Sequence, residues 1–375
     1  MKKMLGLTIL IVGIVALAGC NNGATSADDD TVRIAIAAPM TGDNAEFGLG
    51  FWHAAQLQVD AWNEAGGVLG RQIEVVQFDD GNSNEEGASV AQRIASDGRF
   101  AGVIGPFSSG VGMTVAATYQ DNEIVLISPT VGHPDFTGIG DFIFRNNTTT
   151  GVEAYAMVRM IVEELDVTNV GIISILTEWG ETASGFFHEQ IGNTPGLDIV
   201  AHEQVLEGSN DFSPAITVLE NAGAQVVIVV GMYSTVAPYA IQHRAVNPNV
   251  ELVAFSNAYS HELLALGGAS VEGLMFPVAF FSGSNDPAVV DYVTRFTERF
   301  GSTPSGLTTN AFDAVGVLLA AIEHAGTTDS AAVRDALFEV THAGIIGATS
   351  FDANGETTRT FGRAIIRNGG FELVE

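Results

Sequence analysis

Short apolar runs alternate along the chain with segments that have one apolar face. The run Val32–Ala38 is continuous and contains several β-branched residues, which is typical of a buried strand. In the next segment, Gly48–Asn63, apolar residues recur every three or four positions, at Trp52, Ala55, Val59 and Trp62. This spacing predicts a helix with one buried face, ended by the glycines that follow it.

The same alternation continues almost to the C-terminus. Further strands are expected at 73–80, 101–105, 124–128, 170–176, 224–231 and 251–256. Helices are expected at 85–96, from 109 onward, at 151–165, before 224, at 238–246 and at 309–325. Strands that alternate with helices predict an α/β fold with parallel sheets covered on both faces.

These strand and helix units fall into two blocks, before and after about Asn147. A chain of 375 residues exceeds one ordinary core, so we expect two similar lobes with a cleft between them. In such folds ligands bind beyond the carboxyl ends of the strands, where helices begin. Two stretches of small and hydroxyl-bearing residues, "FSSG" at 107–110 and "SPTVG" at 128–132, follow apolar runs at such places. They are predicted to form half of a small-molecule site.

The first residues have the pattern of an export signal. Lys2 and Lys3 precede an apolar stretch, Leu5–Leu17, that is too short to span a membrane. It leads into "LAGC", which resembles the bacterial lipobox and implies a lipoprotein signal peptide over residues 1–19, with lipidation of Cys20. An ordinary signal peptide with an incidental cysteine is the alternative. Residues 20–30 are polar and predict a flexible tether.

Charge narrows the range of partners. The formal net charge is −29, and both lysines lie within the first 19 residues, so arginine is the only strong base beyond them. We therefore expect no nucleic acid partner, because phosphate binding needs clusters of lysine and arginine. An acidic surface almost without lysine also indicates salt adaptation, as in a halophile, because salt screens the self-repulsion. An acidic exported protein is the simpler alternative.

Motifs for catalysis, nucleotide binding or metal binding are absent from the sequence. No GxGxxG, GxxxxGK[ST], GxSxG or HExxH motif occurs at a suitable place, and the eight histidines are scattered. Cys20 is the only cysteine, so neither a disulfide nor a cysteine–metal site is expected. The sequence therefore predicts a protein that is not an enzyme and that has no metal and no cofactor.

From Val32 onward the chain resembles the type I periplasmic solute-binding proteins of ATP-driven transporters, in the branched-chain amino acid and amide branch. The resemblance depends on an ordered set of segments, among them "IAIAAPMTGDNAEFGLG", "WNEAGGVLGRQIEVVQFDD", "VIGPFSSGV", "TEWGE" and "TTNAFDAVGVLLAAIEHAG". It implies two Rossmann-like lobes joined by three hinge crossings, near Asn147, Phe280 and Thr349. The first lobe then covers 31–147 plus 281–348, and the second covers 148–280 plus 349–375.

The resemblance also implies which residues bind the ligand. Ser109 matches the serine that binds the ligand's carboxylate through its hydroxyl and its amide, with Ser108 beside it. The alternative is that Ser109 only caps the helix that follows. The other matches are the loop residues Thr130, Val131 and Gly132 and the aromatic residues Phe47, Trp179 and Tyr233.

One departure from the family concerns the ligand's ammonium group. Amino-acid-binding members carry an acidic residue where this chain has Asn257, and a neutral amide does not balance a buried charge. Either the ligand lacks an α-ammonium and is an amide, a urea-like compound or a carboxylate, or another acid such as Glu178 or Glu262 reaches the site.

The function that the resemblance implies is that of an extracytoplasmic substrate-binding lipoprotein of an ABC importer. Such a protein, periplasmic or at the cell surface, binds a small amino acid-like solute and presents it to permease subunits. It is expected to be a monomer, to need no cofactor and to be held at the membrane by its lipid. A sensor that signals to a membrane receptor and an exported enzyme acting on a small amide are the alternatives.

Overall fold

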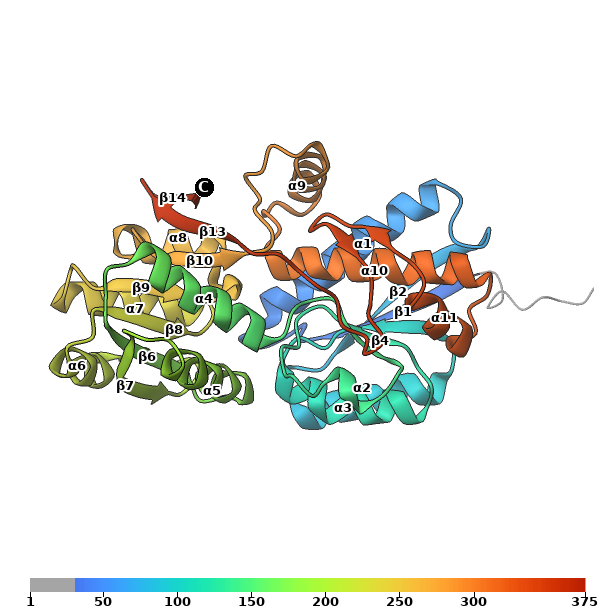
Figure 1. Ribbon diagram of the computed structural model, residues 1–375. Coiled ribbons are helices and arrows are strands. Elements are labelled where there is room, and N and C mark those ends of the chain that lie inside the picture. The colour runs from blue at the N-terminus through green and yellow to red at the C-terminus, as the bar shows by residue number, and fades with distance from the viewer. Residues whose placement is uncertain (1–30, 375) are drawn as a thin grey trace, which may run out of the picture.

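The computed structural model describes residues 31–374 as two lobes that lie side by side (Figure 1). Each lobe is built on one β-sheet with helices on both faces. The predicted α/β class with two parallel-sheet lobes is thereby confirmed. The expectations for the signal peptide, for Cys20 and for the tether at 20–30 concern residues outside this range.

The first lobe has a five-stranded sheet in the order β2-β1-β3-β4-β5, in which all neighbouring strands are parallel. Successive residues of β1 face opposite sides of the sheet, so that Ile34 and Ile36 belong to one core cluster and Ala35 and Ala37 to another. The strands are β1 (Thr31–Ala38), β2 (Gln72–Asp79), β3 (Phe100–Ile104), β4 (Leu126–Ser128) and β5 (Ile143–Arg145). The helices are α1 (Ala45–Glu64), α2 (Asn84–Asp97), α3 (Ser109–Asp121), α9 (Pro287–Phe300), α10 (Gly306–Ala325) and α11 (Ser330–Leu337).

Helix α10 runs through the core of the first lobe. Among residues 31–374 it is the one helix long and apolar enough to cross a membrane. Most of its residues are buried, and it packs against α1 and α11. Its composition is thus that of a core helix.

The second lobe has a seven-stranded sheet in the order β14-β13-β10-β9-β8-β6-β7. Strands β6 to β10 are parallel, and β13 and β14 are antiparallel at one edge. The strands are β6 (Asn169–Ile175), β7 (Asp198–Val205), β8 (Val226–Val230), β9 (Glu251–Ala254), β10 (Met275–Val278), β13 (Gly362–Arg367) and β14 (Gly370–Val374). Helices α4 (Thr150–Glu164) and α5 (Glu178–Gly192) cover one face of this sheet, and α6 (Ser213–Ala222), α7 (Tyr233–Val246) and α8 (His261–Gly267) cover the other.

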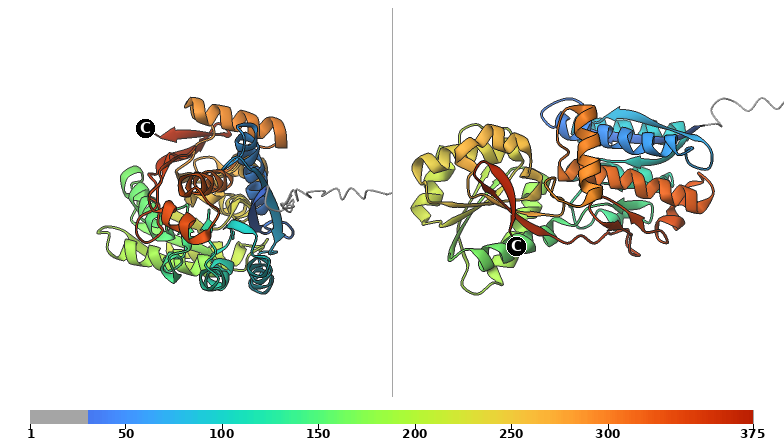
Figure 2. Two further views of the ribbon diagram at one scale, coloured as in Figure 1. Left: turned by 90° about the vertical axis from the view of Figure 1, so that its right-hand side faces the viewer. Right: turned by 90° about the horizontal axis from the view of Figure 1, so that it is seen from above.

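The chain crosses between the lobes after β5, after β10 and before β13 (Figure 2). A two-stranded sheet, β11 (His342–Ala343) with β12 (Ala348–Thr349), precedes the third crossing. At the first crossing the completely buried Arg145 donates to both carboxylate oxygens of Glu356, at 2.8 and 2.7 Å. Because Glu356 belongs to the third crossing, this ion pair joins two of the three connections.

Several expected elements have other bounds in the structure: the strand expected at 124–128 begins at Leu126, and the helices expected from Gly48 and Thr309 begin at Ala45 and Gly306. The strand expected at 251–256 ends at Ala254, and Ser256–Ala258 form a 3₁₀ turn, because the Ser256 N–H donates to the Glu153 carboxylate instead of a neighbouring strand. The helix expected from Pro238 begins earlier, at Tyr233. Pro238 lies in its second turn, where it removes one backbone donor without ending the helix.

Candidate functional site

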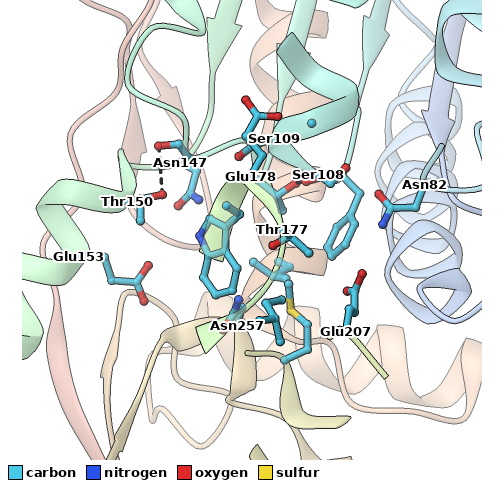
Figure 3. A pocket seen from close by; sticks show the side chains of 18 of the residues that line it. Asn82, Ser108, Ser109, Asn147, Thr150, Glu153, Thr177, Glu178, Glu207 and Asn257 are labelled. Atoms are coloured by element: carbon cyan, nitrogen blue, oxygen red, sulfur yellow. Dashed lines mark hydrogen bonds between the residues drawn. The ribbon is translucent and has the colours of Figure 1, made fainter. Parts of the chain in front are cut away.

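A cavity of about 220 Å³ lies between the two lobes, at the carboxyl ends of both sheets (Figure 3). The first lobe lines it with residues that follow β2, β3, β4 and β5. The second lobe lines it with the start of α4 and with residues that follow β6, β8 and β9. The N-terminal ends of α3, α4, α5 and α7 lie beside it, so their free N–H groups and positive dipole ends favour an anionic group on a ligand.

Ser108, not Ser109, caps helix α3. The Ser108 Oγ accepts from the Val111 N–H at 3.5 Å, and Ser109 is the first residue of the helix. This corrects the alternative in which Ser109 served only as the cap. Both serines line the cavity, and Ser109 is buried. Because the first N–H groups of a helix have no partner within it, Ser109 offers both a hydroxyl and an N–H to an anion.

The loop after β4 contributes Thr130 and Gly132 to the cavity. The Thr130 Oγ1 donates to the Phe107 carbonyl at 2.6 Å, which joins this loop to the one after β3. The Gly132 carbonyl accepts from both the N–H and the hydroxyl of Thr150, at 3.0 Å each. A Cβ at Gly132 would lie 2.3 Å from the Thr150 Oγ1, so the loop has no room for a side chain at this position. The hydroxyl at this point of the cavity wall is therefore that of Thr150 on α4.

Val131, from the same loop, does not line the cavity. Its side chain is completely buried in the core formed with α2 and α3. Its carbonyl accepts from the Arg145 Nη1 at 2.8 Å, so this backbone group is occupied by the hinge arginine.

An apolar wall, contributed by both lobes, borders the cavity. Trp179, the second residue of α5, packs its ring against Phe255 with centroids 5.1 Å apart. The Thr177 Oγ1 caps this helix by accepting from the Gly180 N–H at 3.1 Å, which fixes the place of Trp179. The wall is completed by Phe107, Ile175, Met232 and Leu307.

Phe47 and Tyr233 lie outside this cavity, contrary to expectation. Phe47 is buried and stacks on Phe107, with ring centroids 4.7 Å apart, so it supports the apolar wall from behind. The Tyr233 hydroxyl donates to the Glu46 carboxylate of the other lobe. Met232, the residue before Tyr233, takes the place at the cavity. Phe47 lines instead a second cavity between the lobes, of about 400 Å³.

Three acids near the lobe interface are at least partly in solvent. The Glu178 side chain lines the first cavity but is 40% exposed, and its carboxylate lies 3.8 Å from the His133 ring. Glu207 also lines this cavity and is exposed. Glu262 lines the second cavity. Of the two acids considered from the sequence, Glu178 therefore borders the candidate site and Glu262 does not.

Glu153 is a candidate that the sequence analysis missed. This residue of α4 lines the cavity, is only 8% exposed, and accepts from the Ser256 N–H at 2.6 Å. Burial raises the pKa of Glu153 to about 7, since the hydrogen bonds from the backbone and the side chain of Ser256 compensate only partly for the lost solvation of the charge. A sequence signal existed, because Glu153 precedes the buried Met157 and Met160 by one and two turns and so lies on the apolar face of the helix.

Three buried polar atoms of residues that line this cavity have no hydrogen-bond partner in the described chain. They are the Asn257 Oδ1, the Thr148 Oγ1 and the Asn82 Oδ1. A buried acceptor left unsatisfied costs about 1–3 kcal/mol, so these oxygens favour a ligand that brings N–H groups. Within residues 31–374, the lining of the cavity contains no lysine, arginine or histidine. The site therefore combines helix ends for an anion with side-chain oxygens for a donor.

Known proteins resemble the chain over nearly its whole length. A sequence model of the family described as "Periplasmic binding protein" matches residues 31–367. The Leu/Ile/Val-binding protein homolog 3 of Brucella melitensis is 30% identical over 336 residues, which are 89% of this chain and 90% of the relative. A leucine-binding protein from Thermotoga maritima superposes with a TM-score of 0.83 at 25% identity, covering 92% of this chain and 98% of its own. A branched-chain amino acid transporter substrate-binding protein from Streptococcus pneumoniae, solved with isoleucine, has a TM-score of 0.84 at 24% identity, covering 92% and 99% of the two chains.

Proposed function

This chain belongs to the periplasmic binding protein family, whose members bind solutes and are not enzymes, and from that premise we propose that it is the substrate-binding protein of an ABC importer for a small aliphatic amino acid. Its fold is that of the type I members of the family. The names of the relatives from Brucella melitensis and Thermotoga maritima, which refer to leucine, isoleucine and valine, support this class of solute.

The observation that carries the proposal is the composition of the 220 Å³ cavity between the lobes. Ser109 and the start of α3 offer donors for a carboxylate, and Trp179 and Met232 belong to an apolar wall for an aliphatic side chain. Small-molecule sites have this character, mostly apolar with a few placed polar groups. The volume lies below the ~300–1,000 Å³ of sites for drug-sized ligands, in keeping with a small solute.

The arrangement of the lobes supports transport by hinge closure. The three crossings are the only covalent connections between two separately packed sheets in the described chain, so the lobes can rotate about them. A solute that contacts both lobes stabilises the closed arrangement, which is the form we propose is delivered to a permease. In the same proposal, lipidation of Cys20 holds the protein at the outer face of a membrane, and Asn21–Asp30 separates it from the lipid.

The test is thermal unfolding of the purified protein against a panel of solutes. The panel contains leucine, isoleucine and valine, and, as controls, short amides, urea and aromatic carboxylates. A solute at about 100 times its Kd stabilises the folded state by about 2.7 kcal/mol, which is visible as a higher midpoint. We expect the aliphatic amino acids to raise the midpoint. A rise with amides or carboxylates alone, or no rise with any solute for a cooperatively folded sample, would contradict the proposal.

A further inference from the structure

We propose that Glu153 and the Asn257 side-chain oxygen together bind the ammonium group of the ligand, and that the ligand is accordingly a zwitterionic α-amino acid. The inference rests on the proposed function and adds to it the part of the site that selects for an amine.

The two side chains reach the same part of the cavity from different elements. Glu153 lies on α4, and Asn257 lies in the 3₁₀ turn after β9. The bond from the Ser256 N–H to the Glu153 carboxylate, at 2.6 Å, fixes the turn against the helix and so sets the position of Asn257 beside Glu153. Figure 3 shows the Glu153 carboxylate pointing from α4 toward the group of side chains that line the cavity, with Asn257 in the same group.

Both groups lack the partner that their burial requires. Glu153 is 8% exposed, and its carboxylate accepts from the backbone N–H and the hydroxyl of Ser256, neither of which carries a charge. The Asn257 Oδ1 is buried with no donor at all. A buried carboxylate is costly unless a cation pairs with it, and no cationic side chain of residues 31–374 lines the cavity. The missing cation is therefore supplied from outside the chain.

An ammonium group suits Glu153 and Asn257 better than an amide does. It has a positive charge for Glu153 and three N–H donors, of which two satisfy Glu153 and Asn257. A primary amide has two donors and no charge, so it leaves the ionised acid without a counter-charge. The N-terminus of α3 supplies the complementary donors for the carboxylate of the same ligand.

The other acids at the interface do not fill this role. Glu178 is 40% exposed and already near His133, and Glu207 is in solvent, so water satisfies both carboxylates. Glu262 lines the second cavity. Glu153 is thus the acid of this site for which a cation on the ligand would lower the cost of burying the charge.

Calorimetric titration tests the inference with a pair of ligands that differ only in the amine. The pair is L-leucine and 4-methylpentanoate, the same carboxylate without the amino group. They are titrated into the wild-type protein, into Glu153→Gln, and into Glu189→Gln, which makes the same charge change at an exposed position of α5 outside the cavity. We expect the wild type and Glu189→Gln to prefer leucine by about 100-fold or more, because losing a buried charge partner has an effect of that order.

In Glu153→Gln that preference should collapse to within about tenfold, through weaker leucine binding and little change for 4-methylpentanoate. The double variant Glu153→Gln/Asn257→Asp places a carboxylate beside the vacated position and should recover part of the preference, which a purely structural effect of the first substitution would not produce.

Three results would overturn the inference. The first is leucine binding by Glu153→Gln within about threefold of the wild type. The second is equal binding of leucine and 4-methylpentanoate by the wild type, which needs no variant to fold. In both cases the proposed function stands, because the wild type still binds an amino acid. The third is a wild type that binds only solutes without an amine, which overturns the proposed function together with the inference.

Discussion

Replacing Glu153 with glutamine should stabilise the ligand-free protein in a way that depends on pH. Burial raises the pKa of this carboxyl from its ordinary 4.5 to about 7 in the folded chain. Between these two values the folded state keeps a proton that the unfolded state has released, so stability falls as pH rises through this window. Above about pH 7 the whole cost of ionising the buried acid is present, and below about pH 4.5 none of it is.

The size of the effect follows from the same two values. At ~1.4 kcal/mol per pH unit, the gap between 4.5 and about 7 corresponds to about 3 kcal/mol. Glutamine is neutral at every pH in this range, and its side-chain oxygen still accepts from the Ser256 N–H. Glu153→Gln should therefore be more stable than the wild type at about pH 8, and its advantage should be about 2 kcal/mol smaller at about pH 5.

Urea unfolding at the two pH values measures this difference. Both proteins are first unfolded and refolded so that no bound solute contributes, and Glu189→Gln serves as the exposed control, whose effect should be small at both values. A Glu153→Gln protein that gains the same amount at both pH values, or that loses stability at about pH 8, would refute the reasoning that the buried acid is ionised at a cost in the free protein.

Three further perturbations follow from the structure. Gly132→Ser should destabilise the protein by about 1–3 kcal/mol in urea unfolding, because its Cβ would lie 2.3 Å from the Thr150 Oγ1, and Thr150→Gly in the same chain should recover part of the loss. Glu356→Ala should lower the free energy of unfolding by about 3–5 kcal/mol, because it leaves the buried Arg145 guanidinium without its carboxylate. A free energy of unfolding unchanged from the wild type would contradict this. Raising NaCl from about 0.1 to about 2 M should raise the thermal midpoint, since salt screens the repulsion within a chain of net charge −29, and a falling midpoint would argue against salt adaptation.

The fold was predictable because each of its layers leaves a local pattern. Parallel strands covered on both faces are continuously apolar, as in β8, and the helices between them have apolar residues at helical spacing. One boundary that was wrong depended on a contact distant in sequence. The strand at 251 ends early because Ser256 bonds to a residue more than a hundred positions away, which no local pattern reveals.

The candidate site was predictable only where strand ends determine it. Ser109, Thr130 and Trp179 follow strands and line the cavity, although their roles in binding stay predictions. An aromatic residue after a strand can equally face the core or the other lobe, as Phe47 does on Phe107 and Tyr233 does on Glu46. Whether such an aromatic residue faces the core or the other lobe depends on which residue lies beside it in the fold. The sequence pattern does not reveal that neighbour.

Glu153 escaped notice because the chain is acid-rich, with 44 aspartate and glutamate residues, so one more glutamate is not distinctive. What distinguishes it is burial without a cation, which is costly for the free protein and is relieved by a ligand that brings one. Since Glu153 belongs to the second lobe and Ser109 to the first, the two charges of a zwitterion pair with different lobes, whereas a carboxylate without an amine leaves Glu153 without a counter-charge. Selection for the amine and closure of the lobes would then have the same physical origin, because only a ligand with both charges compensates both surfaces of the cavity.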